Sequence, residues 1–149
     1  MRALTAVTAS LPAIKLPREL AEQLCAHARE AAPEECCGLL GGRAGRAESV
    51  YRLRNVAGDR LTAYEAAPEE LFAAQRLMRE RCEELLAIYH SHPRSEEPRP
   101  SPTDVRLAFY PSAVYLIIGS RAGGECVVRA FRISEREGRW EPAALEGGG

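Results

Sequence analysis

The sequence lacks a long uninterrupted apolar run, so it holds no stretch of the roughly 18 or more residues that crosses a bilayer as a helix. It also shows no pattern of a charged segment, an apolar segment and a small-residue cleavage site, which would indicate a secretory leader. The net charge of −1 leaves no basic excess of the kind that nucleic-acid binders carry. These absences predict a cytoplasmic protein that acts on neither membranes nor nucleic acid.

Cysteine is scarce, and its number, five, is odd. A chain of 149 residues buries about two thirds of its unfolded surface on folding, so it needs no covalent crosslinks. We therefore expect no disulfide framework, in keeping with a reducing compartment. Cys25, Cys82 and Cys126 occupy apolar positions and are expected in the core. Cys36 and Cys37 lie in an apolar run, where cysteine usually acts as a small hydrophobe, and metal ligation is the less favoured alternative.

The spacing of apolar residues predicts one domain of alternating helices and strands over residues 13–143. Helical periodicity covers residues 17–32, 68–82 and 102–109. Short apolar or alternating runs predict strands at 13–16, 36–42, 50–54, 85–89, 113–119, 126–133 and 138–142. This order predicts an α/β (α+β) domain, a mixed β-sheet flanked by helices. Residues 1–12 are expected to form a flexible lead-in and residues 144–149 a flexible glycine-rich tail.

Two of the three histidines, His90 and His92, come directly after an apolar strand. Residues two apart on an extended chain face the same side, so both imidazoles can bind one metal ion while Ser91 points away. Asp104, at the start of the next predicted helix, can fold back as a third ligand. Three protein ligands and an open fourth position are typical of a catalytic zinc. A His-x-His pair by itself is a weak signal, since surface strand ends carry histidines for many reasons.

Hydrolysis of an amide at such a site also needs a base, and Glu35 is the candidate because it precedes a buried strand. Its neighbour Glu34 is interpreted as a solvated acid. Ser101 could donate a hydrogen bond to the oxyanion that forms on the attacked carbonyl. Ser101-Pro102-Thr103-Asp104 is equally a capping box, with Ser101 at the N-cap and Asp104 at the third helical position. The capping role and the catalytic role are compatible.

Three segments together resemble the signature of the JAMM (MPN-plus) metallopeptidases, which combines a glutamate, a His-Ser/Thr-His-Pro run and a Ser-x-x-Asp run. Here they are Glu35-Cys36-Cys37-Gly38, His90-Ser91-His92-Pro93 and Ser101-Pro102-Thr103-Asp104. Residues 87–90, 111–116 and 129–133 also look like the small bacterial and archaeal single-domain members of the Mec type. Asp104 lies twelve residues after His92, one more than is usual in that family.

The resemblance implies a cytidine-deaminase-like fold and a zinc metallopeptidase or isopeptidase. Such an enzyme cleaves after the C-terminal Gly-Gly of a small ubiquitin-like or sulfur-carrier protein. By the same resemblance His90, His92 and Asp104 hold one zinc ion per chain, Glu35 is the general acid/base and Ser101 supports the tetrahedral intermediate. The alternative is a catalytically silent MPN-type scaffold or carrier-binding module, and a DNA-processing relative is disfavoured by the neutral charge. The carrier, the length of the extension removed and the choice between monomer and homodimer stay open.

Overall fold

A computed structural model describes residues 13–148, and the lead-in expected over residues 1–12 lies outside this range. The elements follow one another along the chain as β1 (Ile14–Pro17), α2 (Arg18–Ala31), β2 (Cys37–Arg43), β3 (Arg46–Leu53), α3 (Pro68–Glu80), β4 (Glu84–Ser91), α4 (Pro102–Arg106), β5 (Val114–Ser120), β6 (Cys126–Ser134), β7 (Arg139–Pro142) and β8 (Leu145–Gly148). The predicted helices and strands are all present, with bounds that differ by a few residues. No described helix is long and apolar enough to cross a membrane.

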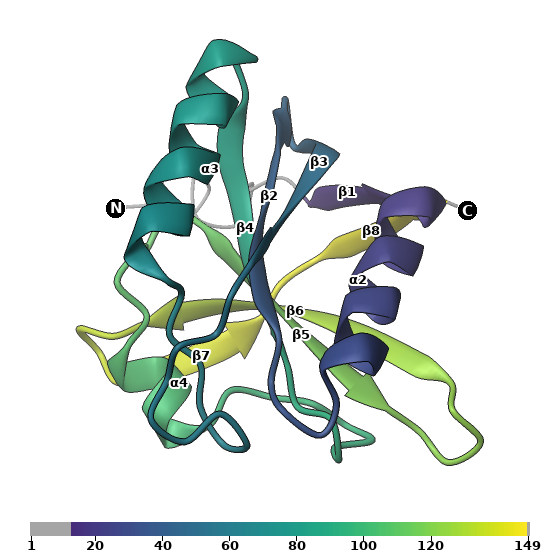
Figure 1. The fold of residues 1–149 in the computed structure, drawn as a ribbon. Helices are drawn as coiled ribbons and strands as arrows, with labels where there is room; N and C mark the ends of the chain where they lie inside the picture. The colour runs from purple at the N-terminus through teal and green to yellow at the C-terminus, as the bar shows by residue number, and fades with distance from the viewer. Residues whose placement is uncertain (1–12, 149) are drawn as a thin grey trace, which may run out of the picture.

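The strands form one sheet of eight strands in the order β7-β6-β5-β4-β2-β3-β1-β8. β2 pairs antiparallel with both β3 and β4, whereas β4 pairs parallel with β5, so the sheet is mixed. Figure 1 shows the sheet as a strongly twisted layer with α2 on one side and α3 and α4 on the other. The predicted architecture, a mixed sheet flanked by helices, is confirmed.

Each face of the sheet has its own apolar core, because successive residues of a strand point to opposite sides. On the α2 face, Leu24 packs with Tyr89 and Leu116. On the face of α3 and α4, Met78 and Val105 pack with Ile88, Tyr115 and other residues. The alternation along β4 therefore places His90 on the α3 and α4 face, between Tyr89 and Ser91 on the α2 face.

The helix predicted over residues 102–109 is shorter than expected and ends at Arg106. Pro111 disfavours a helical conformation at Tyr110, the residue before it. Leu107 and Phe109 are about half or more exposed, at 49% and 64%, so continuing the helix is not supported by apolar packing. The prediction that this helix continues to about residue 109 was therefore wrong by about one turn.

The glycine-rich tail predicted to be flexible contains a strand. β8 pairs parallel with β1 over four residues, from Ile14 opposite Leu145 to Pro17 opposite Gly148. Strand pairing uses backbone N–H and C=O groups, which glycine retains although it has no side chain. Composition alone therefore gave the wrong expectation for residues 145–148.

The expectation of no disulfide is also wrong, because Cys25 in α2 is bonded to Cys126 at the start of β6. Their Cα atoms are 6.0 Å apart, within the range that a disulfide spans. The two residues are separated by 101 positions in the sequence, so only the packing of α2 on the sheet brings them together. Cys36, Cys37 and Cys82 are free, and Cys82 is exposed rather than in the core.

Replacing both Cys25 and Cys126 with serine is expected to lower the free energy of unfolding by about 2–4 kcal/mol, because the crosslink restricts the unfolded chain. Urea unfolding followed by circular dichroism measures this change. Cys82→Ser, at an exposed free thiol, is the control and should have little effect. Detection of all five cysteines as free thiols in the denatured, unreduced protein would contradict the crosslink.

Candidate metal centre

Three side chains from two separate segments converge at the end of β4. The Nε2 atoms of His90 and His92 lie 3.1 Å apart, and each lies 3.1 Å from Oδ2 of Asp104. His90 is fully buried, whereas the His92 side chain is 17% exposed. Ser91 points to the other face, where its hydroxyl accepts a hydrogen bond from Cys36 N–H. The predicted juxtaposition of His90, His92 and Asp104 is therefore present.

Asp104 also caps α4. Ser101 Oγ accepts from Asp104 N–H at 3.0 Å, and Ser101 N–H donates to Asp104 Oδ2 at 2.9 Å, which is a complete capping box. Burial alone would raise the pKa of Asp104, but hydrogen bonds with both histidines and Ser101 N–H hold that pKa well below its usual range. The same carboxylate oxygen thus serves the helix cap and faces both imidazoles, so the two interpretations of this motif coexist.

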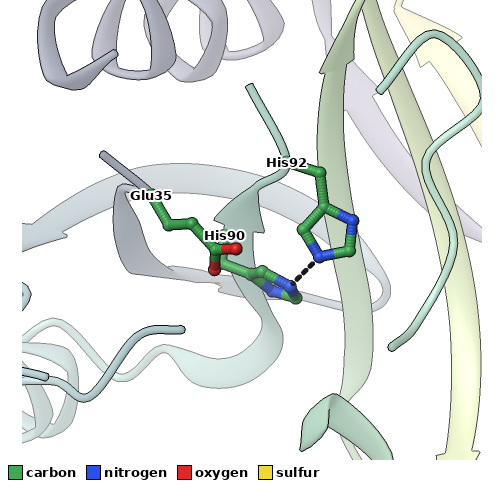
Figure 2. Close-up of side chains that lie close together, drawn as sticks. All are labelled: Glu35, His90 and His92. Carbon is green, nitrogen blue, oxygen red and sulfur yellow. Dashed lines mark hydrogen bonds between the residues drawn. The ribbon is translucent and has the colours of Figure 1, made fainter. Parts of the chain in front are cut away.

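Glu35 precedes β2 and lies beside the histidines, as Figure 2 shows. One ligand atom from each of Glu35, His90 and His92 lies within 4.8 Å of the other two. Glu35 is only 6% exposed, and burial raises its pKa from 4.5 to about 7, with smaller contributions from Asp104 and Asp59. Its Oε1 has no hydrogen-bond partner among the described residues. A buried carboxyl group of this kind is suited to accept and return a proton.

The Glu34 side chain, in contrast, is 45% exposed and forms an ion pair with Arg60 at 3.2 Å. This contact matches the prediction that Glu34 is a solvated acid. The third histidine, His27, lies in α2 away from this site, and its Nδ1 is 2.7 Å from the Tyr89 hydroxyl on the α2 face. Burial lowers the pKa of His27 to about 4, with a smaller contribution from Arg52.

The donor set fits a divalent metal ion such as zinc. Two imidazole nitrogens and one carboxylate oxygen face a common point, and these are ligand types that zinc accepts. Burial lowers the pKa of His90, which favours the neutral ring needed for metal binding. The thiols of Cys36 and Cys37 are buried, and burial raises their pKa values to about 11 and about 12. Among the described residues, the cluster of possible metal ligands that includes Glu35, His90 and His92 contains no cysteine.

A loop between β3 and α3 completes the surroundings of the site, and sequence analysis did not identify it. Tyr64 from this loop stacks on the His90 ring, with centroids 4.4 Å apart and planes at 22°. Asn55 donates to Glu35 C=O at 2.9 Å, and Arg60 C=O accepts from Glu35 N–H at 2.8 Å. No sequence spacing links residues 55–64 to the histidines, so this role could be found only in three dimensions.

An apolar cavity of about 500 Å³ lies next to the site on the α3 and α4 face. Tyr64 belongs both to its wall and to the surroundings of His90. Phe109 and Tyr110, the exposed residues that follow α4, form part of the same wall. On this side the site is therefore bordered by a largely apolar surface.

Comparison with known proteins identifies one matching family and several related proteases and peptidases. Residues 17–134 match the family Prok-JAB, described as prokaryotic homologs of the JAB domain. The chain is 40% identical to a probable TtuB-protein conjugate cleaving protease from Thermus thermophilus, over 80% of this chain and 76% of the relative. It is 36% identical to a desampylase from Haloferax volcanii, over 70% and 78%. It is 33% identical to a CysO-cysteine peptidase from Mycobacterium tuberculosis, over 83% and 85%.

Solved structures agree with the fold. A solution structure of a protein from Desulfitobacterium hafniense superposes with a TM-score of 0.78 at 36% identity, covering 90% of this chain and 92% of the other. A structure titled as JAMM, a metalloprotease-like zinc site in the proteasome and signalosome, superposes with a TM-score of 0.54 at 19% identity. It covers 90% of this chain and 98% of the other, and at this identity the likeness concerns the fold.

The buried Glu35 carboxyl generates a prediction for the metal-free protein. Its pKa is higher in the folded chain than in the unfolded chain, so the unfolded chain binds fewer protons between about pH 4.5 and about pH 7. The free energy of unfolding of the wild-type protein therefore falls as the pH rises through this range. Glu35→Gln removes this dependence. Its stability relative to wild type should therefore increase by on the order of 2–3 kcal/mol between pH 4.5 and pH 8.

Urea unfolding in the presence of a chelator at both pH values measures this difference. The matched control is Glu34→Gln, which changes an exposed, ion-paired carboxylate and should shift stability similarly at both pH values. If the free energy of unfolding of Glu35→Gln differed from that of wild type by the same amount at pH 4.5 and pH 8, burial would not raise the pKa of Glu35.

Proposed function

Because the chain belongs to the family of prokaryotic homologs of the JAB domain, we propose that it is a zinc-dependent metallopeptidase acting on conjugates of small proteins. Its substrate is the amide bond after the C-terminal Gly-Gly of a ubiquitin-like or sulfur-carrier protein. The relatives named as desampylase, TtuB-protein conjugate cleaving protease and CysO-cysteine peptidase support this substrate class. The enzyme class rests on both the family and the local geometry.

The observation that carries the proposal is the convergence of Asp104 Oδ2 with the Nε2 atoms of His90 and His92, with Glu35 beside them. His90, His92 and Asp104 would hold one zinc ion per chain. When bound, zinc supplies a Lewis acid that polarises the scissile carbonyl and makes water more acidic. A silent scaffold needs no such convergence of buried polar groups, which are costly to bury without a role.

Glu35 moves the proton in this mechanism. Its buried carboxyl, with a pKa raised to about 7, accepts a proton from the attacking water and returns it to the leaving nitrogen. The backbone of Glu35 is fixed on both sides, by Arg60 C=O and by the Asn55 side chain. The carboxyl group is therefore held in place next to the histidines rather than on a free loop.

Ser101 has the hydrogen needed for its proposed role. Its Oγ accepts from Asp104 N–H in the helix cap, which leaves its O–H free to donate. A donor aimed at the oxyanion stabilises negative charge as it develops on the attacked carbonyl. Ser101 thus has two roles, as the N-cap of α4 and as the proposed hydrogen-bond donor to the oxyanion.

An extended Gly-Gly tail can bind by strand addition. One edge of β3 pairs with β2. Along its other edge, β3 pairs with another described strand at one position, where Arg46 lies opposite Lys15 in β1. The later residues of β3 have no strand partner on that side, and Leu53 at the end of β3 pairs with Cys37, two residues after Glu35. This geometry offers the tail an edge that leads toward the proposed general base.

The cytoplasmic location predicted from the sequence stays a prediction. A disulfide such as Cys25–Cys126 forms more readily in oxidising compartments. Size-exclusion chromatography with light scattering distinguishes a monomer from a homodimer.

The first test is the zinc content of purified protein after dialysis against metal-free buffer, measured by elemental analysis. Wild type should retain about one zinc ion per chain, and Asp104→Ala should lose most of it. Ser101→Ala is the matched control, because it breaks the helix cap at the same motif but keeps all three proposed ligands. Absence of zinc from wild type, even after incubation with excess metal, would overturn the proposal in favour of a carrier-binding module.

The second test separates metal binding from proton transfer. Glu35→Gln should retain zinc but lose turnover by about 100-fold or more, because the proton acceptor is missing. His92→Ala should lose both zinc and turnover. The assay follows release of a C-terminal extension from a ubiquitin-like carrier ending in Gly-Gly, with Glu34→Gln as the active control. Normal turnover by Glu35→Gln would refute its role as general base.

A further inference from the structure

The His90 ring has an unusual environment for a metal ligand. Its Nε2 faces Asp104 and His92, but its buried Nδ1 has no hydrogen-bond partner among residues 13–148. Metal-binding histidines usually donate from their second nitrogen to a carbonyl or carboxylate, which fixes the orientation of the ring. Another contact must therefore hold the His90 ring in place.

Tyr64 makes that contact. Its ring lies nearly parallel to the His90 ring, 22° between planes and 4.4 Å between centroids, whereas His92 meets His90 at 66°. A stacked neighbour restricts rotation of the imidazole about its side-chain bonds and covers one face of it. The Tyr64 hydroxyl has no hydrogen bond to any described side chain, so the flat ring is the part that acts on His90.

Asn55 fixes the segment that carries Tyr64. Its amide Nδ2 donates to Ala63 C=O at 3.0 Å, and its Oδ1 accepts from Glu65 N–H at 3.0 Å. These bonds hold the residues immediately before and after Tyr64. The same amide donates to Glu35 C=O at 2.9 Å. One side chain thus connects the backbone of the proposed base to the tyrosine that stacks on a proposed ligand.

We propose that Tyr64 is a positioning residue for the metal centre, which orients the His90 imidazole by stacking, with Asn55 as the anchor of its loop. This inference rests on the proposed function, because it assigns to His90 the role of zinc ligand. Tyr64 touches neither the zinc ion nor the substrate in this role. It orients the ring of His90 by stacking, a role that a hydrogen bond from Nδ1 usually fills in metal-binding histidines.

The test compares two substitutions of the same residue. Tyr64→Phe keeps the flat ring and should bind zinc within about twofold of wild type. Tyr64→Leu remains apolar but cannot stack, and it should lose about 10–100-fold in zinc affinity, the range seen when the group that orients a metal ligand is removed. Affinity is measured by competition with a chromophoric chelator. The visible spectrum of the Co²⁺-loaded protein reports ligand geometry independently of activity.

Tyr110→Leu is the matched control, since it makes the same change in the wall of the same cavity at a residue outside the metal centre. Its zinc affinity and Co²⁺ spectrum should equal those of wild type. Circular dichroism establishes that each variant is folded, and Tyr64→Met replaces Tyr64→Leu if the leucine variant does not fold.

Three results would overturn the inference. The first is wild-type zinc affinity and an unchanged Co²⁺ spectrum in the variant that cannot stack. The second is an equal loss in Tyr64→Phe, which would assign the effect to the hydroxyl. The third is an equal loss in Tyr110→Leu, which would make it a general effect of the cavity. If wild type bound no zinc, the proposed function would fail, and this inference with it.

Discussion

The Asp104 carboxylate links the folding of α4 to the geometry of the candidate metal centre. One oxygen of this group accepts from Ser101 N–H and faces the Nε2 atoms of both histidines. The helix cap fixes where the carboxylate points, because its partner Ser101 N–H belongs to the N-cap residue of the same helix. In turn, burial of the carboxylate is tolerated because its hydrogen bonds with both histidines and with Ser101 N–H stabilise its charged form.

The two faces of the sheet perform different tasks. On the α2 face, apolar packing, the Cys25–Cys126 disulfide and the contact between His27 and Tyr89 hold the helix against the strands. On the other face, His90, the last residue but one of β4, lies within a largely apolar environment shared with α3 and α4. The alternation of side chains along β4 separates these tasks, since neighbouring residues serve opposite faces. Rigid packing on one side supports a polar site on the other.

Much of the fold follows from local pattern. The apolar strand before His90, the hairpin of β2 and β3 and the amphipathic helices were predictable because their side-chain periodicity matches their surroundings. Three expectations failed for related reasons. The end of α4 depends on Pro111 and on a lack of packing partners, β8 depends on an open edge at β1, and the disulfide depends on how α2 docks. Each of these three features depends on packing or on a contact with a residue distant in the sequence. The periodicity of side chains along one segment contains no information about such contacts.

The sequence by itself determined which residue types meet: His90 and His92 by their spacing at a strand end, Asp104 by its capping motif, and Glu35 by its place before a buried strand. Only the tertiary structure decided that the longer segment between His92 and Asp104 still brings the carboxylate within 3.1 Å of both rings. It also decided that Tyr64 stacks on His90 and that Asn55 anchors its loop. Spacing within one segment is set by local backbone geometry, whereas contacts between segments depend on how the whole chain packs.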